Sequence, residues 1–260
     1  MLASLRCSFR IIRCMDGLSP LCDGLLLPGE TDCCPLLYGQ KKKGSRNVFL
    51  EEDLLQLCAL ERYRRAGRPV LGIDKGMHII NLSFGGNTRQ HIGHYPHDAV
   101  RLNCGMPEDT AAAADCPHDV GRLQYDSRTS ALFDTLPESA PTRTVSSGAA
   151  PSALTAVPAA LSPVRKTAGT NLLVFDRLHS TRLREGSMPE ALYGTSLLVN
   201  SRHHQALDRI GSGLDVVQLA FDGCPEAVQH RTLPIIGVQW HPECLSPDGS
   251  LLFRLFLALV

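Results

Sequence analysis

The chain has 260 residues, of which 43% are hydrophobic and 20% charged, and this composition is ordinary for a soluble globular protein of one large domain or two small ones. The 26 Lys and Arg residues balance the 26 Asp and Glu residues, so charge gives no reason to expect a nucleic acid or an anionic membrane as a partner. No apolar run approaches the roughly 20 residues needed to cross a bilayer, so we expect no membrane span.

The N-terminus and the cysteines bear on the cellular compartment. The first fifteen residues carry Arg6, Arg10 and Arg13 and no acid, which faintly resembles an organelle transit peptide, but the stretch is short and lacks the continuous apolar region of a secretory signal. The ten cysteines are scattered and form no C-x-x-C pair, so neither a disulfide framework nor a zinc site is expected. We therefore expect reduced thiols in a cytoplasmic protein.

Short apolar runs alternate with helical patterns after the N-terminus. Residues 25–27 (LLL), followed by Pro and Gly, read as a buried strand, and residues 48–65 read as a helix. Residues 69–73 (PVLGI) and 76–84 predict a second strand and helix, and this order favours a parallel sheet with helices on its faces. In the first helix we expect one apolar stripe to face the core and the charged positions to face solvent. The stripe comprises Leu50, Leu54, Leu57, Cys58 and Leu60, and the charged positions are Glu51, Glu52, Arg62 and Arg64.

The middle of the chain differs in composition. Between residues 137 and 170, 25 of 34 residues are Ala, Pro, Ser, Thr or Gly, and such a segment cannot bury enough apolar surface to offset its chain entropy. We interpret residues 104–170 as a long, largely disordered insertion within one domain, and a linker between two domains is the alternative.

Regular patterns return after this segment. Residues 197–199 predict a strand, and residues 214–220 and 227–231 predict a hairpin around an Asp-Gly turn. Residues 233–240 form a central apolar strand that ends at a His-Pro-Glu sequence, and residues 251–260 predict a closing helix.

Residues 72–76 (GIDKG) lie between a predicted strand and a predicted helix, and they have the G-x-nucleophile-x-G form of a nucleophile elbow. The two glycines leave space for the sharp turn, so the middle residue, Asp74, projects above the carboxyl edge of the sheet beside a helix N-terminus. That place suits a group that attacks a carbonyl and the oxyanion that then forms. Taken alone, the pattern fits an aspartate N-cap better than a catalytic site.

Four segments far apart in the chain carry further motifs: residues 23–29 (DGLLLPG), 68–77 (RPVLGIDKGM), 199–206 (VNSRHHQA) and 237–243 (GVQWHPE). In this order they resemble the class I glutamine amidotransferase-like family, and the His-His-Gln sequence points to its gamma-glutamyl-gamma-aminobutyrate hydrolase branch. The resemblance covers most of the chain outside residues 1–21 and the insertion. Because the motifs flank the insertion, we expect one domain over residues 1–260.

The resemblance implies a flavodoxin-like, three-layer α/β fold, with a parallel sheet, mixed at its edge, between helices. It implies hydrolysis of the gamma-glutamyl bond of a small glutamylated amine, within polyamine or GABA catabolism, by a Cys-His-Glu triad in which His241 moves the proton and Glu243 orients it. The implied partner is a small gamma-glutamyl molecule, no cofactor is expected, and homo-oligomerisation is left open. The oxyanion-hole positions would be Gly29, Glu30 and Lys75, and the substrate pocket would contain His203, His204 and Gln205.

Some of these residues also have plain structural interpretations. His203 and His204 fit packing or surface positions equally well, Glu243 fits a surface acid, and His241 before a proline fits the end of a strand. The match over residues 237–243 favours the catalytic interpretation of the last two.

The chain departs from the family pattern at the site itself. The family keeps its cysteine nucleophile where this chain has Asp74, and a carboxylate attacks amides poorly because the product is a high-energy anhydride. Its charge would also oppose the oxyanion, and loss of an activated nucleophile commonly costs several powers of ten in rate. Glu30 replaces a glycine beside the oxyanion hole, and Lys75 replaces an arginine.

The N-terminal region departs as well. The family has a strand and a helix before its D-G-L-L-L segment, and only 21 residues precede Cys22 here. Either residues 1–21 supply that strand or the domain is shortened. We therefore expect a family member whose hydrolase activity is reduced or absent. The alternatives are a non-catalytic binding protein that keeps the pocket, and a metal site built from Asp74, Glu30 and His241.

Overall fold

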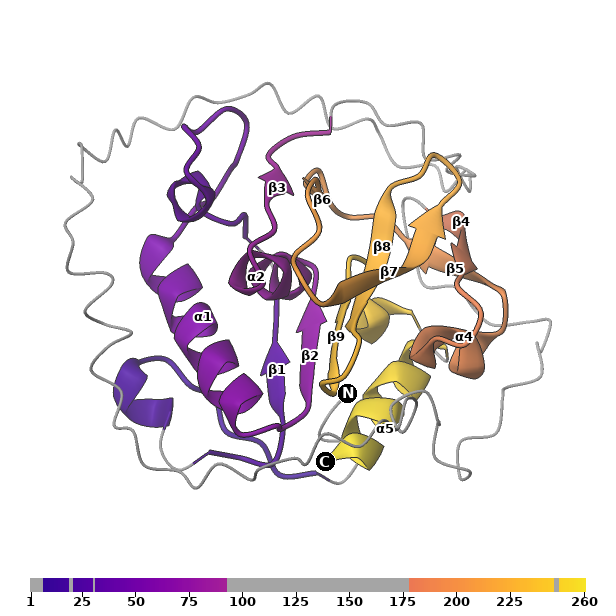
Figure 1. The fold of residues 1–260 in the computed structure, drawn as a ribbon, viewed down its shortest axis with the longest axis horizontal. Coiled ribbons are helices and arrows are strands. Elements are labelled where there is room, and N and C mark those ends of the chain that lie inside the picture. The colour runs from indigo at the N-terminus through magenta and orange to yellow at the C-terminus, as the bar shows by residue number, and fades with distance from the viewer. Residues whose placement is uncertain (1–6, 19–20, 30, 93–177, 246–247) are drawn as a thin grey trace. The chain divides into compact units, whose positions relative to one another are not determined.

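The computed structural model describes residues 7–18, 21–29, 31–92, 178–245 and 248–260 (Figure 1). All of these residues fall in one unit of the chain, Met1–Cys104 with Ser152–Val260. The insertion expected at residues 104–170 lies outside the described residues and stays a prediction. None of the helices in the described ranges is long and apolar enough to span a membrane.

A seven-stranded sheet forms the centre of this unit, in the order β1-β2-β9-β8-β7-β4-β5 (Figure 1). The first two pairings in that order are parallel and the other four are antiparallel. The strands are β1 (Leu25–Leu27), β2 (Val70–Ile73), β4 (Leu178–Leu183), β5 (Ser196–Asn200), β7 (Leu214–Ala220), β8 (Pro225–His230) and β9 (Ile235–Val238). A separate antiparallel pair consists of β3 (Thr88–Arg89) and β6 (Ala206–Leu207).

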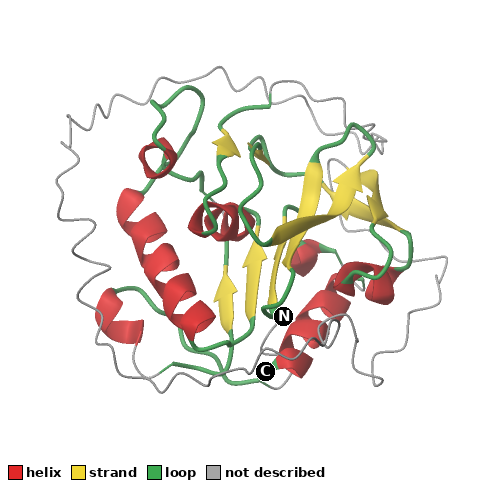
Figure 2. Ribbon diagram, viewed as in Figure 1, coloured by secondary structure: helices red, strands yellow, loops and turns green. Residues whose placement is uncertain are grey.

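Helices cover both faces of the sheet (Figure 2). Val70 of β2 packs in one core cluster with residues of α1 (Leu50–Arg65) and α2 (Lys75–Ser83). Leu71 and Ile73 of the same strand pack in the opposite cluster with α4 (Met188–Tyr193) and α5 (Gly249–Leu259). A strand that is buried on both faces needs an unbroken apolar sequence, which residues 70–73 have. The α/β fold predicted from the sequence is confirmed.

Every predicted helix and strand that falls in the described ranges is present, with ends within two residues of the prediction. The antiparallel part of the sheet is larger than expected, because the sequence analysis did not find β4. This strand has the sequence LHSTRL and so lacks a continuous apolar run. Its polar residue Thr181 is buried, and the Thr181 hydroxyl donates a hydrogen bond to the carbonyl oxygen of Leu197. The helix α4 and the β3-β6 pair were also missed.

The apolar stripe predicted for α1 was wrong. The buried side of this helix contains Asp53, Gln56, Ala59, Leu60 and Tyr63. Of the predicted stripe only Leu60 is buried, and the residues at positions 50, 54, 57 and 58 are half-buried. Two polar residues face inward because this side of α1 lies over the elbow and the turn after β1. Gln56 donates a hydrogen bond to the carbonyl oxygen of Pro28 (3.3 Å), and Asp53 pairs with a buried lysine described below.

The N-terminal region contributes no strand within residues 7–18. It contains a short 3-10 helix, η2 (Met15–Leu18), whose Leu18 is fully buried in the cluster formed with α1. Within the described ranges β1 therefore forms one edge of the sheet.

Candidate active site

The turn between β2 and α2 has the geometry of the predicted nucleophile elbow. Asp74 has φ +47° and ψ −109°, in a region that non-glycine residues rarely occupy and that clusters at functional sites. A Cβ atom at Gly72 would lie 2.6 Å from the carbonyl carbon of Gly76, and one at Gly76 would collide with the carbonyl oxygen of Leu27. Both glycines are therefore required by the close approach of neighbouring backbone.

The turn after β1 lies directly against this elbow. A Cβ atom at Gly29 would collide with the backbone nitrogen of Lys75 and would lie 2.5 Å from the carbonyl oxygen of Ile73. Two of the predicted oxyanion-hole positions, Gly29 and Lys75, are thus brought together. Glu30, the third, lies outside the described residues, and its role stays a prediction.

His241 and Glu243 form a hydrogen-bonded pair at the same edge of the sheet. The His241 ring nitrogen Nδ1 lies 2.7 Å from Glu243 Oε1. Burial alone would lower the pKa of His241, but the Glu243 carboxylate more than offsets this and raises it, while the Glu243 pKa falls. A histidine oriented by a carboxylate is the arrangement of a general base in nucleophilic catalysis.

Adjacent strands bring Asp74 and His241 to one site. β2 and β9 are parallel neighbours with Ile73 opposite Val238, so Asp74 and His241 both follow the carboxyl ends of these strands. Burial raises the pKa of the Asp74 carboxyl, and the positive charges of His241 and His203 act against that rise. The carboxylate at position 74 therefore shares an electrostatic environment with both imidazoles.

A chain of hydrogen bonds fixes the Asp74 carboxylate. Gln239 Nε2 donates to Asp74 Oδ1 at 2.7 Å, and Gln239 Oε1 accepts from His78 Nε2 at 3.0 Å. His78 Nδ1 lies 3.1 Å from the Thr88 hydroxyl, and burial lowers the His78 pKa to about 4, so this imidazole is neutral. The sequence analysis assigned no role to Gln239, His78 or Thr88, although Gln239 lies within the quoted GVQWHPE motif.

Asn200 is another residue that the sequence analysis missed. Its side chain accepts from the His241 backbone N–H and donates to the His241 carbonyl oxygen, both at 2.8 Å. The end of β5 thereby fixes the backbone of His241. The only sequence signal was the place of Asn200 in the VNSRHHQA motif.

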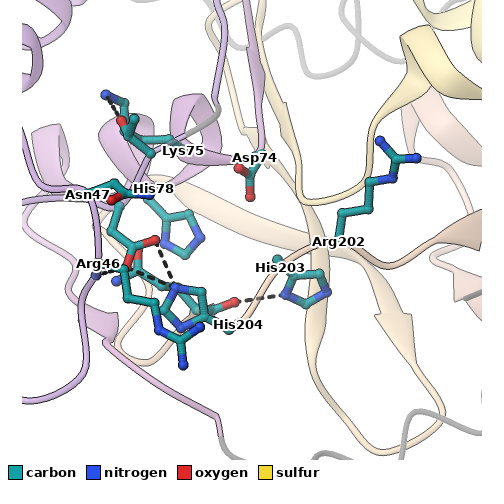
Figure 3. Close-up of a pocket in the computed structure, with 11 residues that line it drawn as sticks. Arg46, Asn47, Asp74, Lys75, His78, Arg202, His203 and His204 are labelled. Carbon is teal, nitrogen blue, oxygen red and sulfur yellow. Dashed lines mark hydrogen bonds and ion pairs between the residues drawn. The ribbon is translucent and has the colours of Figure 1, made fainter. Parts of the chain in front are cut away.

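A polar pocket of about 170 Å³ opens beside the elbow (Figure 3). This volume is below the about 300–1,000 Å³ of drug-sized sites, which favours a small ligand. The lining residues are Thr31, Asp32, Arg46, Asn47, Asp74, Lys75, His78, Arg202, His203, His204 and Gln205.

The three predicted substrate residues all line this pocket, and each also contacts the protein. His203 Nδ1 donates to the Gln205 carbonyl oxygen (2.8 Å), and His204 Nε2 lies 2.9 Å from an oxygen of Asp32. The Gln205 amide bonds the hydroxyl of Ser45 (3.0 Å) and the backbone N–H of Cys33 (3.3 Å). Their contact with a substrate stays a prediction.

The Lys75 side chain points away from the pocket centre toward α1 (Figure 3). Its Nζ atom lies 3.1 Å from Asp53 Oδ1, 2.8 Å from Glu52 Oε1 and 2.7 Å from the Thr31 hydroxyl. The side chains of Lys75 and Asp53 are both fully buried. Glu52 is exposed, as predicted, and also contributes to this network.

The metal alternative finds no support in the residues that the structure describes. Among them, no group of three or more His, Cys, Asp or Glu side chains is arranged to hold a metal ion. The proposed set of Asp74, Glu30 and His241 includes one residue outside those ranges.

The sequence matches the Peptidase C26 family over residues 13–129 and 157–243. A glutamine amidotransferase-like protein of Rickettsia prowazekii is 28% identical over 256 residues, covering 95% of this chain and 79% of the relative. Another, of Lactococcus lactis, is 25% identical over 227 residues, covering 86% and 67%. A solved glutamine amidotransferase structure from Thermotoga maritima superposes with a TM-score of 0.45 at 8% identity, covering 96% of this chain and 66% of that one.

Proposed function

The chain belongs to the peptidase C26 family, and from this premise we propose that its pocket is a gamma-glutamyl amide hydrolase site whose turnover is impaired by the carboxylate at position 74. The observation that carries the proposal is the His241–Glu243 hydrogen bond of 2.7 Å beside the elbow. The His241–Glu243 hydrogen bond is not needed to hold the His241 backbone in place, because Asn200 already bonds its N–H and its carbonyl oxygen. The glutamine amidotransferase-like relatives support the same class of chemistry.

With a thiol at position 74, each proton and bond has a defined place. His241 would take the thiol proton, and the thiolate would attack the gamma-carbonyl carbon to give an oxyanion next to the Gly29 and Lys75 backbone. The carbon–nitrogen bond would break as His241 returns the proton to the leaving amine. Water would then hydrolyse the thioester and release glutamate. The substrate that the family resemblance suggests is a small glutamylated amine such as gamma-glutamyl-GABA.

Asp74 obstructs this sequence in two ways. Its carboxylate attacks an amide only by forming an anhydride, which lies above the amide in energy. The backbone N–H of Lys75 also interacts with the Asp74 carboxylate and favours its ionised form, so the resident anion competes for a donor that the oxyanion needs.

The test is a paired assay of glutamate release from gamma-glutamyl-GABA by the unmodified chain and by Asp74→Cys. We expect the variant to exceed the unmodified chain by at least about a hundredfold, because a restored nucleophile commonly contributes several powers of ten. Asp74→Asn is the matched control, since it removes the charge without adding a thiol, and Asp74→Cys/His241→Gln removes the proton acceptor. A variant no faster than these controls would rule the hydrolase site out.

A ligand-binding protein without turnover is the second candidate function. Its support is the pocket itself, which remains hollow and polar around a residue that is a poor nucleophile. Calorimetric titration of the unmodified chain with gamma-glutamyl-GABA distinguishes the two: binding without glutamate release, and no gain from Asp74→Cys, would favour the binding protein.

A further inference from the structure

A buried carboxylate behind the pocket has no part in the chemistry described above. Glu226 of β8 is fully buried, and Nε2 of His179 on β4 lies 3.1 Å from its Oε1 atom. Nε2 of His203 lies 3.6 Å from the same oxygen. Both imidazole side chains are almost fully buried, at 2% and 1% exposure, so water contributes little to the balance of charge among the three groups. An ionised carboxylate in such a place requires a cationic partner.

The contacts of His203 determine its protonation state. Its Nδ1 atom faces the Gln205 carbonyl oxygen, which can only accept, so Nδ1 carries a proton. Its Nε2 atom faces the Glu226 carboxylate, which also only accepts when it is ionised. Burial alone would raise the pKa of Glu226, but the two histidines reduce it to about 2, and Glu226 raises the pKa of His203 although burial acts to lower it. The carbonyl partner of Nδ1, the carboxylate 3.6 Å from Nε2 and the raised pKa together favour the imidazolium form of His203.

His203 and Asp74 line the same pocket (Figure 3). Other charged or titratable groups near His203 include His179 of β4, the neutral His78 of α2, and the pocket residues Asp74, Arg202 and His204. Of these, Asp74 is the group whose charge His203 opposes.

We infer that Glu226 is a positioning residue that keeps His203 as an imidazolium, and that this imidazolium stabilises a negative charge on the side chain at position 74. In the present chain that charge is the Asp74 carboxylate, and with a thiol it is the thiolate that attacks the substrate. The inference deepens the proposed function, since a thiolate is the form of cysteine that reacts. Because both ring nitrogens of His203 face acceptors of the protein, it acts on position 74 through charge rather than through a hydrogen bond to the substrate.

The direction in which Glu226→Gln shifts the thiol pKa separates this role from a simple charge effect. Glu226→Gln removes a negative charge, and that removal alone would make a thiol at position 74 ionise more easily. If Glu226 acts through His203, the imidazolium is lost together with the carboxylate, and His203, unlike Glu226, lines the pocket with position 74. The thiol should then ionise less easily.

The experiment measures thiol ionisation in the full chain carrying Asp74→Cys. Alkylation by iodoacetamide, in which the thiolate displaces iodide, is followed against pH, and mass spectrometry of the peptide containing position 74 separates it from the native cysteines. The Asp74→Cys midpoint is the low reference against which the other variants are compared, because burial raises the thiol pKa and the imidazolium opposes that rise. Adding Glu226→Gln should raise the midpoint by about one unit, a roughly tenfold loss of thiolate below it. Asp215→Asn removes another carboxylate of the same hairpin and should leave the midpoint unchanged.

Three outcomes overturn the inference: no shift with Glu226→Gln, a downward shift, or an upward shift that persists when His203→Gln is already present. If Glu226→Gln unfolds the chain, Glu226→Asp keeps a carboxylate and must keep the low midpoint, while His203→Gln must raise it, and failure of either comparison equally overturns the inference. The alkylation profile does not depend on hydrolysis. A midpoint that depends on Glu226, without glutamate release, would contradict the proposed function alone, and release with a midpoint insensitive to Glu226 would contradict this inference alone.

Discussion

Asp74 is a half-buried carboxylate that lines the pocket. Burial raises the pKa of its carboxyl, although His241 and His203 oppose the rise. Since the folded state then binds the Asp74 proton more tightly than the unfolded state does, stability falls as pH rises from the ordinary carboxyl value through the folded value, and the loss persists at neutral pH. The residue proposed to impair hydrolysis is thus also expected to destabilise the fold.

Asp74→Asn should therefore raise the melting temperature at neutral pH. The amide is nearly isosteric, can still accept the hydrogen bond from Gln239 through its oxygen, and tolerates a positive φ at least as well as aspartate does. The increase should shrink in acid, below the ordinary carboxyl pKa of about 3.9, where Asp74 is protonated in both states. Thermal unfolding at the two pH values checks this, and an equal increase at both would show that charge is not the cause.

At the residue scale, the sequence identified the segments of the candidate site but not the contacts that support them. The segments containing His241, Glu243 and the elbow could be identified because their letters are contiguous. The supporting contacts could not, because they join distant residues: His78 bonds Gln239 across 161 positions, and Asn200 bonds His241 across 41. A polar residue within a motif does not show which backbone group or ring it will meet.

At the scale of elements, the ion pair between α1 and α2 is the main departure from the predicted pattern. A helix that presents carboxylates to its packed side is unexpected from apolar periodicity alone, which is why the leucine stripe was predicted. Lys75 requires this arrangement, because a fully buried ammonium group is unstable without an anionic partner. Asp53 is that partner, and its carboxylate also accepts a hydrogen bond from the Cys34 backbone N–H at 2.6 Å. The apolar pattern thus predicted the ends of α1 to within two residues, but not which side of the helix faces the core.

Lys75→Met should destabilise the chain by about 3–5 kcal/mol, because it leaves the Asp53 carboxylate buried without its cation. Adding Asp53→Asn should restore part of that loss, since the amide oxygen still accepts from Cys34 and no charge remains unpaired. Urea unfolding of both single variants and the double variant gives the coupling energy. Strict additivity of the two single effects would mean that the pair does not act as a unit.

At the scale of the whole molecule, two sequence segments on either side of residues 93–177 form one sheet. β2 and β9 pair through four residues each in parallel register, and β9 continues into the antiparallel strands. The α/β class followed from the alternation of buried strands and helices, whereas strand order could not be read from the sequence, because the partner of β2 is set by packing rather than by neighbouring residues.

Limited proteolysis should cut first within residues 104–170, where the composition predicts disorder. The two resulting fragments should stay together on size exclusion, because cutting there leaves the β2–β9 hydrogen bonds and both core clusters intact. Fragments that separate under native conditions would instead indicate two independent domains.

The position of β9 between β2 and β8 has a consequence for biosynthesis. While the chain emerges from the ribosome, β1 and β2 can form, but the inner edge of β2 stays without its neighbour until residues 235–238 have been made. Non-local pairings of this kind form slowly, and an open strand edge invites association with other nascent chains. Chaperone dependence during translation, rather than low final stability, is the expected weakness of this topology.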